Sequence, residues 1–409
     1  MSSSVTLPAD FSNKNLVWIP NEKLALSLAL VCGEPDSVGW VDVESIETGE
    51  RLRISTDDCQ KSNTAEYENC ENMTIFPCLN EPSILKNLKH RFVSNVFYTY
   101  SGQTCIFINP YKHIPIYTDS ISKDYQGKKR KEMPPHIFAI ADEAYRKMIY
   151  EGKGQTILCT GESGAGKTEN SKKIIKHLVY VAGNRSGVDS SSTVEQNRIF
   201  MDTLENRLIH VNPILEAFGN SKTSKNYNSS RFGKFVKIHF DKNGLILGAS
   251  IETFLLESSR ITNQEQDDRT FHIFYQMIQG LSKSQRDVLF IKDKAVDYEF
   301  LKNGCDKIPC VNDADEYRQT LQAMLMMGLN DEQINQIHRI ASAILLFGDL
   351  NFSQVNKDDD QAALVNKNVA DQIADLLGVD AQKLIESILK PKIEVQGSST
   401  HRSQTIDQT

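Results

Sequence analysis

A glycine-rich loop that ends in lysine and threonine, residues 161–168, carries the clearest chemistry in this chain. It reads GESGAGKT and fills the phosphate-binding pattern G-x-x-x-x-G-K-[ST]. Glycines let the backbone wrap around phosphate oxygens, so that amide N–H groups and the positive end of a following helix point at the anion. Lys167 adds a cation for the terminal phosphates, and Thr168 offers a hydroxyl to a magnesium ion. The loop therefore predicts a nucleoside triphosphate site.

The segments on either side of this loop are those that such a site requires. Residues 155–160 are short and apolar, which predicts a buried strand. Residues 169–180 predict a helix with Ile174, Ile175 and Leu178 on one side. A chance glycine turn beside a lysine does not account for strand, loop and helix in this order.

A second polar cluster must decide between kinases, GTPases and ATPases, which share the phosphate loop. Residues 226–235 read NYNSSRFGKF and bring amide, hydroxyl and guanidinium groups to the start of an alternating strand at 235–240. Small polar side chains of this kind ligate a metal ion or cover a γ-phosphate.

At these motifs the sequence resembles the myosin motor domain family. That family's phosphate loop reads GESGAGKTEN and its switch I element reads NxNSSRFGKF, and both are present at 161–170 and 226–235. The resemblance runs from about Leu16 to the last residue, and it is nearest to conventional, filament-forming myosin II heavy chains. Further matching stretches are the adenine-contacting segment at 109–117, the stretch at 133–139 that follows it, and residues 212–220 and 255–260.

The resemblance implies a role for each matching residue. Lys167, Asn226, Ser229 and Arg231 match the catalytic positions, with Ser229 placed to pass on a proton from the attacking water. Thr168 and Ser230 match the two hydroxyl ligands of Mg²⁺. The positions that match ATP contacts are Asn109, Pro110, Tyr117, Gly161, Glu162, Ser163, Gly164, Ala165, Gly166, Lys167, Thr168, Glu169 and Asn226.

The sequence departs from the family pattern in two places. Tyr227 stands where many relatives have a third asparagine. No segment resembles switch II, whose glutamate pairs with the switch I arginine in the family, so we expect Arg231 to be unpaired and the central sheet to have exposed edges. The segment most similar to switch II, residues 344–349, instead continues a helical pattern. We expect Asp331 to cap that helix and Gly348 to end it. We therefore expect the chain to stop partway through a motor domain, at a surface loop near residues 397–404.

The predicted fold class is α/β: a P-loop NTPase core with a mixed central sheet, an N-terminal SH3-like β-barrel and a helical upper 50-kDa subdomain, truncated at its C-terminus. Short strands at 16–19 and 51–54 indicate the barrel. Other expected elements are helices at 83–91, 136–150, 267–278, 332–347 and 381–389, a strand at 104–108, and a hairpin of 236–240 with 249–255. The expected domains are 1–57 for the N-terminal tail and barrel, 58–261 for the ATPase core, and 262–409 for the helical subdomain.

Composition agrees with a globular intracellular protein. The 409 residues are 40% hydrophobic and carry a net charge of −7, which excludes a disordered or nucleic-acid-coating class. No apolar run has membrane-spanning length, and the start lacks the regions of a signal peptide. The eight cysteines are scattered, and Cys105 and Cys159 lie in apolar stretches, which favours buried reduced thiols over disulfides or zinc ligands.

Three further features have ordinary explanations. The serine-rich stretch 183–192 stands in the place of the family's loop 1, or is a plain solvated linker. The basic run 127–131 indicates a solvated charged face rather than a nuclear localisation or nucleic-acid patch. His177, His239 and His272 lack paired ligand spacing, so packing or surface roles are expected.

The resemblance implies an N-terminal fragment of a myosin heavy-chain motor. Such a fragment binds ATP and Mg²⁺ and, in the complete protein, couples hydrolysis to movement on actin filaments in the cytoplasmic actin cytoskeleton. Light chains and a tail-mediated dimer are expected for the full-length chain, and nucleic acid is not an expected partner. One alternative is a nucleotide-binding module without actin-activated turnover. An unrelated P-loop kinase is the other, and the motif at 226–235 argues against it.

Overall fold

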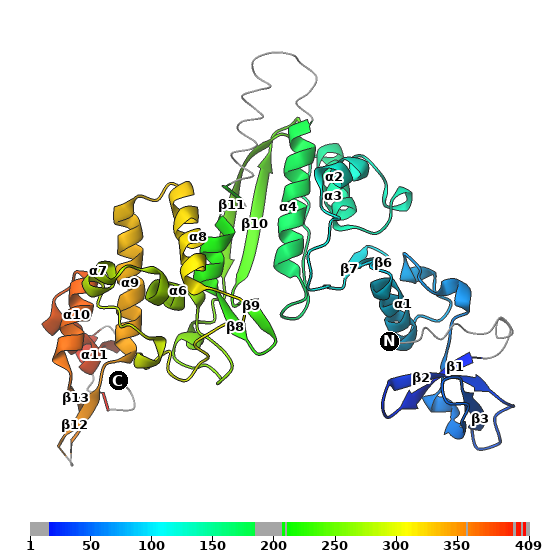
Figure 1. The fold of residues 1–409 in the computed structure, drawn as a ribbon, viewed down its shortest axis with the longest axis horizontal. Helices are drawn as coiled ribbons and strands as arrows, with labels where there is room; N and C mark the ends of the chain where they lie inside the picture. Colours follow the sequence, from blue (N-terminus) through cyan, green and yellow to red (C-terminus); the bar gives the residue numbers. More distant parts are fainter. Residues whose placement is uncertain are drawn as a thin grey trace. The chain divides into compact units, whose positions relative to one another are not determined.

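The computed structural model describes residues 16–184, 207–208, 211–356, 359–395, 398–401 and 404–405 (Figure 1). The chain divides into two compact units, with the boundary after Arg185. Unit 1 contains the phosphate loop, and unit 2 contains residues 226–235. The serine-rich stretch lies outside the described residues from residue 185 onward, so its expected role stays a prediction, as do the expected domain boundaries.

Unit 1 begins with a small antiparallel sheet whose strand order is β4-β3-β2-β1-β5. Alternate side chains of β3 are buried, as expected for strands with one face on a core. The buried cluster is Val17, Ile19, Ala29, Val41 and Val43. This confirms the strands predicted in the first 57 residues. The strands are β1 (Leu16–Asn21), β2 (Ala25–Val31), β3 (Trp40–Ser45), β4 (Arg51–Ser55) and β5 (Gln60–Lys61).

Helices and one hairpin make up the rest of unit 1. Helix α3 packs against α4, and α2 packs against both. The predicted helices at 83–91, 136–150 and 169–180 are confirmed; the first and third extend beyond both predicted ends, and the second is shifted by one residue. The elements are α1 (Glu81–Val93), β6 (Tyr98–Ser101), β7 (Thr104–Phe107), α2 (Asp119–Tyr125), α3 (Ile137–Glu151) and α4 (Lys167–Asn184).

The predicted strand at 155–160 is wrong. The structure assigns no regular secondary structure to 154–160, and the Leu158 side chain is 83% exposed. A strand is stable only where a neighbour completes its hydrogen-bond ladder. No described strand of unit 1 pairs with this segment. Local apolarity alone therefore does not make it a buried strand.

A buried polar network joins α2, α3 and α4. The Nδ1 atom of His177 lies 2.5 Å from Ser122 Oγ, and its ring stacks on Phe138 at 4.8 Å between centroids. Burial disfavours ionisation of Asp142, but the nearby His177 ring, at 3.8 Å, and hydrogen bonds from Arg146 and the backbone of Gly127 outweigh it and lower the pKa of the carboxyl. Both His177 and Asp142 are almost fully buried, so the expected packing role of His177 is confirmed.

His136 makes the stability of unit 1 sensitive to pH. Its Nδ1 accepts a hydrogen bond from the Phe138 backbone N–H at 3.1 Å and so caps α3. Burial, with the neighbouring His177, lowers the pKa of His136 to about 3. In an unfolded chain a histidine titrates near 6.5, so the unfolded state alone takes up this proton below that pH. The stability contributed by neutral His136 is therefore complete above pH 6.5 and is lost as the pH falls toward 3.

We expect His136→Asn to flatten this dependence, because asparagine keeps the cap and has no imidazole. Between pH 6 and 4 the slope of unfolding free energy against pH should fall by about 1.4 kcal/mol per pH unit. Urea unfolding followed by tryptophan fluorescence measures this, since both tryptophans, Trp18 and Trp40, lie in unit 1. His239→Asn, at an exposed position in unit 2, is the control. An unchanged slope in His136→Asn would contradict the prediction.

Residues 211–219 of unit 2 are helical, and two hairpins follow them. Strand β8 (Asn220–Thr223) pairs with β9 (Asn226–Ser230), and β10 (Gly233–Phe240) pairs with β11 (Ile246–Phe254). Asp241 Oδ1 accepts from the backbone N–H groups of Asn243 and Leu245 and closes the turn between β10 and β11. The second hairpin is confirmed, but 236–240 pair with 246–251, so the strand predicted at 249–255 begins three residues earlier than expected.

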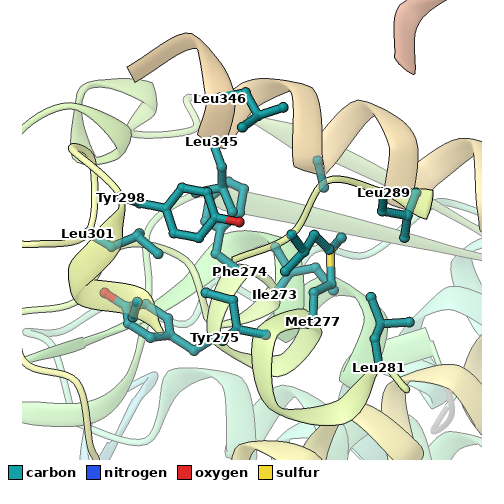
Figure 2. Packing of buried hydrophobic residues seen from close by; sticks show 14 of the residues in the cluster. Ile273, Phe274, Tyr275, Met277, Leu281, Leu289, Tyr298, Leu301, Leu345 and Leu346 are labelled. Atoms are coloured by element: carbon teal, nitrogen blue, oxygen red, sulfur yellow. The ribbon is translucent and has the colours of Figure 1, made fainter. Parts of the chain in front are cut away.

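The rest of unit 2 is mainly helical and packs around α6. Figure 2 shows Ile273, Phe274 and Met277 of α6 among Leu345 and Leu346 of α9 and further apolar side chains, all within one buried cluster. The elements are α6 (His272–Gly280), α7 (Lys283–Val288), α8 (Asp313–Met326), α9 (Asp331–Gly348), β12 (Phe352–Asn356), β13 (Asp359–Leu364), α10 (Lys367–Leu377), α11 (Ala381–Leu389), β14 (Lys392–Val395) and β15 (Ser398–His401).

Two predicted helix starts in unit 2 need correction. Helix α6 begins at His272, five residues later than the start predicted at 267, because Asp268 and Arg269 take part in buried ion pairs instead. Helix α9 is capped by Asn330, whose side chain accepts from the Gln333 N–H, and not by Asp331. The segment 344–349 is confirmed as the end of this helix and not a metal-binding strand.

The other predictions about side-chain surroundings have mixed outcomes. All eight cysteines are free, but Cys105 and Cys159 are only partly buried, and Cys159 lies outside any strand. Apart from Arg130, which pairs with Glu143, the basic run 127–131 is exposed, as expected for a solvated face. No helix in the described ranges is both long and apolar enough to cross a membrane.

Candidate nucleotide site

The phosphate loop turns tightly because three of its glycines adopt positive φ angles. Gly161 has φ 145°, Gly164 has φ 81° and Gly166 has φ 92°. Side-chain-bearing residues rarely adopt such angles. Space is also restricted, since a Cβ on Gly166 would lie 2.8 Å from Phe107 Cε1, and one on Gly161 would lie 3.1 Å from Ala165 Cβ. Only glycine fits this loop at these positions.

Side chains from two other segments hold the loop in shape. Asn109 Nδ2 donates to the Gly164 carbonyl at 2.7 Å. Asn170, one turn into α4, donates from Nδ2 to the Gly166 carbonyl at 3.0 Å and accepts from the Tyr98 hydroxyl at 2.6 Å. The Tyr98 oxygen also lies 2.8 Å from the Tyr117 hydroxyl. Asn109 thus contacts the phosphate loop directly, and Tyr117 is linked to it through Tyr98 and Asn170.

Lys167 begins α4 and folds back over the loop. Its Nζ donates to the carbonyl oxygens of Gly161 at 2.7 Å and Glu162 at 2.8 Å. The ammonium group is therefore placed beside the loop backbone by hydrogen bonds to its first two residues. Thr168 follows in the first turn of the helix, and the Glu169 carboxylate pairs with Lys172 Nζ at 2.9 Å, one turn further on.

Aromatic and cationic groups from other segments surround Tyr117, which lies in the segment 109–117. The Tyr117 ring lies 5.5 Å from the ring of His136, and Lys173 Nζ lies 5.0 Å from its centre. Pro110 precedes Tyr111, which has a positive φ of 50° and is 73% exposed. The Tyr117 ring offers a flat apolar face with a hydroxyl group at one end.

Residues 226–231 belong to unit 2 and form a separate cluster on β9. Asn226 Oδ1 accepts from the Asn228 N–H at 3.1 Å, which fixes the Asn226 amide on its own strand. Ser229 is 1% exposed, whereas Tyr227 is 52% exposed, and its side chain is not part of the buried face of β9. Ser230 is the last residue of the strand. The structure brings Asn226, Ser229, Ser230 and Arg231 together within six residues of chain.

Arg231 is paired, which corrects the expectation that it lacks an acidic partner. Its Nε donates to Glu257 Oε2 at 2.6 Å, and its Nη1 donates to Ser229 Oγ at 3.0 Å. Burial disfavours the ionised form of Glu257, but hydrogen bonds from Arg231 and Arg260 outweigh it and lower the pKa of the carboxyl. Glu257 lies in the family-matching stretch 255–260, but nothing in the sequence pairs it with Arg231.

Comparison with known proteins agrees with the geometry of the loop. The family model for the myosin head (motor domain) matches residues 70–409. This chain belongs to the myosin motor domain family. The non-muscle myosin heavy chain of Drosophila melanogaster is similar to it, with 44% identity over 431 residues, which cover 96% of this chain and 21% of the relative. The chain therefore spans about a fifth of the length of that relative. Its mixture of helices and antiparallel strands is consistent with the α/β class expected of a myosin head.

The phosphate loop of this myosin head fits a nucleotide phosphate group. Glycine backbone with no room for a Cβ, a lysine ammonium beside it and the N-terminus of the long helix α4 are the features that bind phosphate. Thr168 lies at the same helix N-terminus and carries the hydroxyl that a divalent cation requires. These features support assigning the nucleotide to this end of α4.

Proposed function

We propose that this chain is the nucleotide-binding part of a myosin motor, which binds ATP with Mg²⁺. The observation that carries the proposal is the geometry of residues 161–167: three glycines with positive φ angles, followed by a lysine that the loop carbonyls hold in place. In the whole protein we propose that hydrolysis is coupled to movement on actin filaments in the cytoplasm. Membership of the myosin family supports this second part.

The proposed assignment of residues follows the two clusters. Loop N–H groups and Lys167 bind the phosphates, and Asn109, Pro110 and Tyr117 hold the adenine ring. The remaining nucleotide contacts come from Glu162, Ser163, Ala165, Glu169 and Asn226. Thr168 and Ser230 would hold Mg²⁺, which when bound neutralises charge on the phosphate oxygens.

Hydrolysis transfers the γ-phosphoryl group to water. The water oxygen forms a bond to the γ-phosphorus, the bond to the bridging oxygen breaks, and its electron pair stays on ADP. We propose that Ser229 passes a proton of the attacking water to a γ-phosphate oxygen through its hydroxyl. The contact from Arg231 Nη1 supports this role because it occupies one lone pair of Ser229 Oγ and so restricts the directions of the hydroxyl proton.

The finer organisation is also part of the proposal. We propose an SH3-like barrel for residues up to 57, an ATPase core for 58–261 and the helical upper 50-kDa subdomain for 262–409. The upper half of the actin-binding cleft belongs to the last of these. Light chains and a dimer-forming tail are partners of the full-length heavy chain.

Titration of the purified chain with fluorescent mant-ATP, with and without Mg²⁺, tests the nucleotide site. Magnesium-dependent binding is the expected result, and the absence of binding would overturn the proposal. Steady-state hydrolysis with and without filamentous actin tests the motor part. Actin-stimulated turnover would support it, whereas binding with slow, actin-insensitive turnover would limit the function of this chain to nucleotide binding.

A further inference from the structure

The Arg231 side chain forms hydrogen bonds with two other side chains of unit 2. Its guanidinium donates from Nε to Glu257 Oε2 at 2.6 Å and from Nη1 to Ser229 Oγ at 3.0 Å. Guanidinium is planar and rigid, so fixing its Nε edge also fixes the direction of its two Nη groups. The position of Glu257 therefore determines how Arg231 meets Ser229.

Glu257 is itself held by a second arginine. Its Oε2 also accepts from Arg260 Nε at 2.8 Å, and Arg260 Nη1 donates to Asp268 Oδ2 at 2.9 Å. The side chains of Arg260 and Asp268 are only 9% and 10% exposed. Partly buried, charge-assisted hydrogen bonds of this kind are stronger than exposed ion pairs. Arg231, Glu257, Arg260 and Asp268 together are called the Glu257 cluster below.

A turn with an unusual backbone angle precedes Glu257 and places it beside Arg231. Leu255, directly after β11, has a positive φ of 54°, which is uncommon for a residue with a branched side chain, and it is 86% exposed. Two residues later, the Glu257 N–H donates to the Arg231 carbonyl at 2.9 Å. A turn of this kind is maintained when the surrounding contacts determine it. Arg231 and Glu257 are thus joined by both a side-chain and a backbone contact.

The cluster also holds the opposite end of β9. Asp268 Oδ1 accepts from the Ser224 N–H at 3.0 Å, two residues before the strand begins. The neighbouring Arg269 N–H donates to the Lys222 carbonyl at 2.9 Å. Arg231 comes immediately after the strand, so the cluster contacts the chain on both sides of Asn226–Ser230.

We infer that Glu257 is a positioning residue for this strand: it holds Arg231 by its Nε edge, and Arg231 in turn orients the Ser229 hydroxyl. Glu257 contacts the nucleotide only indirectly, through these two residues. The inference rests on the proposed function for the role of Ser229, but not for the geometry of Glu257 and Arg231. The lowered pKa of Glu257 and the raised pKa of Arg260 agree with an ionised cluster, although burial opposes the charge on both.

Exchange of the Arg231 Nε–H proton with water, measured by NMR, tests the geometry without any nucleotide. The signal is assigned by its loss in Arg231→Lys. Glu257→Gln keeps the size of the side chain and removes its charge, and we expect exchange to become about tenfold faster because a charge-assisted bond is weakened. Glu252→Gln is the matched control, since Glu252 forms an exposed pair with Lys237 on the same hairpin. Unchanged exchange in Glu257→Gln would overturn the inference.

Nucleotide affinities then test the link to Ser229. Groups that act at the γ-phosphate affect AMPPNP and leave ADP unaffected. In Glu257→Gln we expect about tenfold weaker binding of AMPPNP with Mg²⁺ and an unchanged affinity for ADP. In an Arg231→Ala background Glu257→Gln should have no further effect, because Glu257 acts through Arg231. Additive losses, or equal losses for both nucleotides, would contradict the link.

The outcomes separate this inference from the proposed function. If the unchanged chain binds neither nucleotide, the proposed function fails, and the exchange measurement still decides the role of Glu257. If Glu257→Gln reduces the yield of folded protein, Arg260→Lys instead loosens the second contact that holds the Glu257 carboxylate, because lysine keeps the charge but lacks the planar fork. Faster Arg231 Nε–H exchange in that variant supports the inference, and unchanged exchange opposes it.

Discussion

Replacing Lys167 with methionine is expected to weaken binding of MgATP by about a hundredfold or more. The ammonium group of Lys167 is the cation that the loop holds beside its own backbone, through contacts with Gly161 and Glu162. A unit charge at about 4 Å from a phosphate oxygen contributes roughly 4 kcal/mol near a protein surface, and 1.4 kcal/mol is tenfold in affinity. Methionine keeps most of the side-chain length and apolar volume, so the loss is one of charge and hydrogen bonding.

Titration with mant-ATP in the presence of Mg²⁺ measures this effect. Lys147→Met is the control, because Lys147 lies in the same unit and its half-exposed side chain pairs with Glu143 on α3. That variant should bind as the unchanged chain does. Equal affinity of Lys167→Met and the unchanged chain would mean that the phosphates bind elsewhere.

Local chemistry allowed the phosphate loop and most helices to be predicted from the sequence. Glycine spacing followed by Lys167 specifies a tight turn before a helix, and both the turn and α4 are present. The hairpin of β10 and β11 was predicted for a similar reason, since its two strands are joined by a short turn that Asp241 closes. Features whose causes lie within about 20 residues of chain can be read from periodicity and turn residues.

Features that depend on distant partners could not be predicted. Residues 155–160 have the composition of a strand, but a strand requires a neighbour, and composition does not say whether one is in place. The pairing of Arg231 with Glu257 joins residues 26 positions apart through a turn that relies on positive φ at Leu255, which has no sequence signature. Asn170 is the last residue of the family-matching stretch 161–170, but the sequence does not show that it connects Gly166 to Tyr98.

Gly166→Ala is expected to abolish measurable nucleotide binding, for two independent reasons. Alanine is strained at the φ of 92° that Gly166 adopts. Its Cβ would also lie 2.8 Å from Phe107 Cε1 and 3.3 Å from Cδ1, so either the ring or the loop must move. Because Gly166 immediately precedes Lys167, a shift of its backbone displaces the lysine and the first N–H groups of α4. Displacement of about 1 Å is enough to cost a hundredfold in a site built on fixed geometry.

Gly183→Ala, in the helix that follows the loop, provides a matched control. Gly183 has no positive φ, and a Cβ there would meet no atom within 4 Å, so alanine should leave binding unchanged and stabilise α4 by about 0.5–1 kcal/mol. The double variant Gly166→Ala with Phe107→Leu separates the two causes, since leucine removes the ring but not the backbone strain. Partial recovery of mant-ATP binding would show that the remaining loss of affinity comes from backbone strain at residue 166. Full recovery would show that the whole loss comes from the clash with the Phe107 ring. Normal binding by Gly166→Ala alone would show that the loop does not need the observed backbone conformation to hold phosphate.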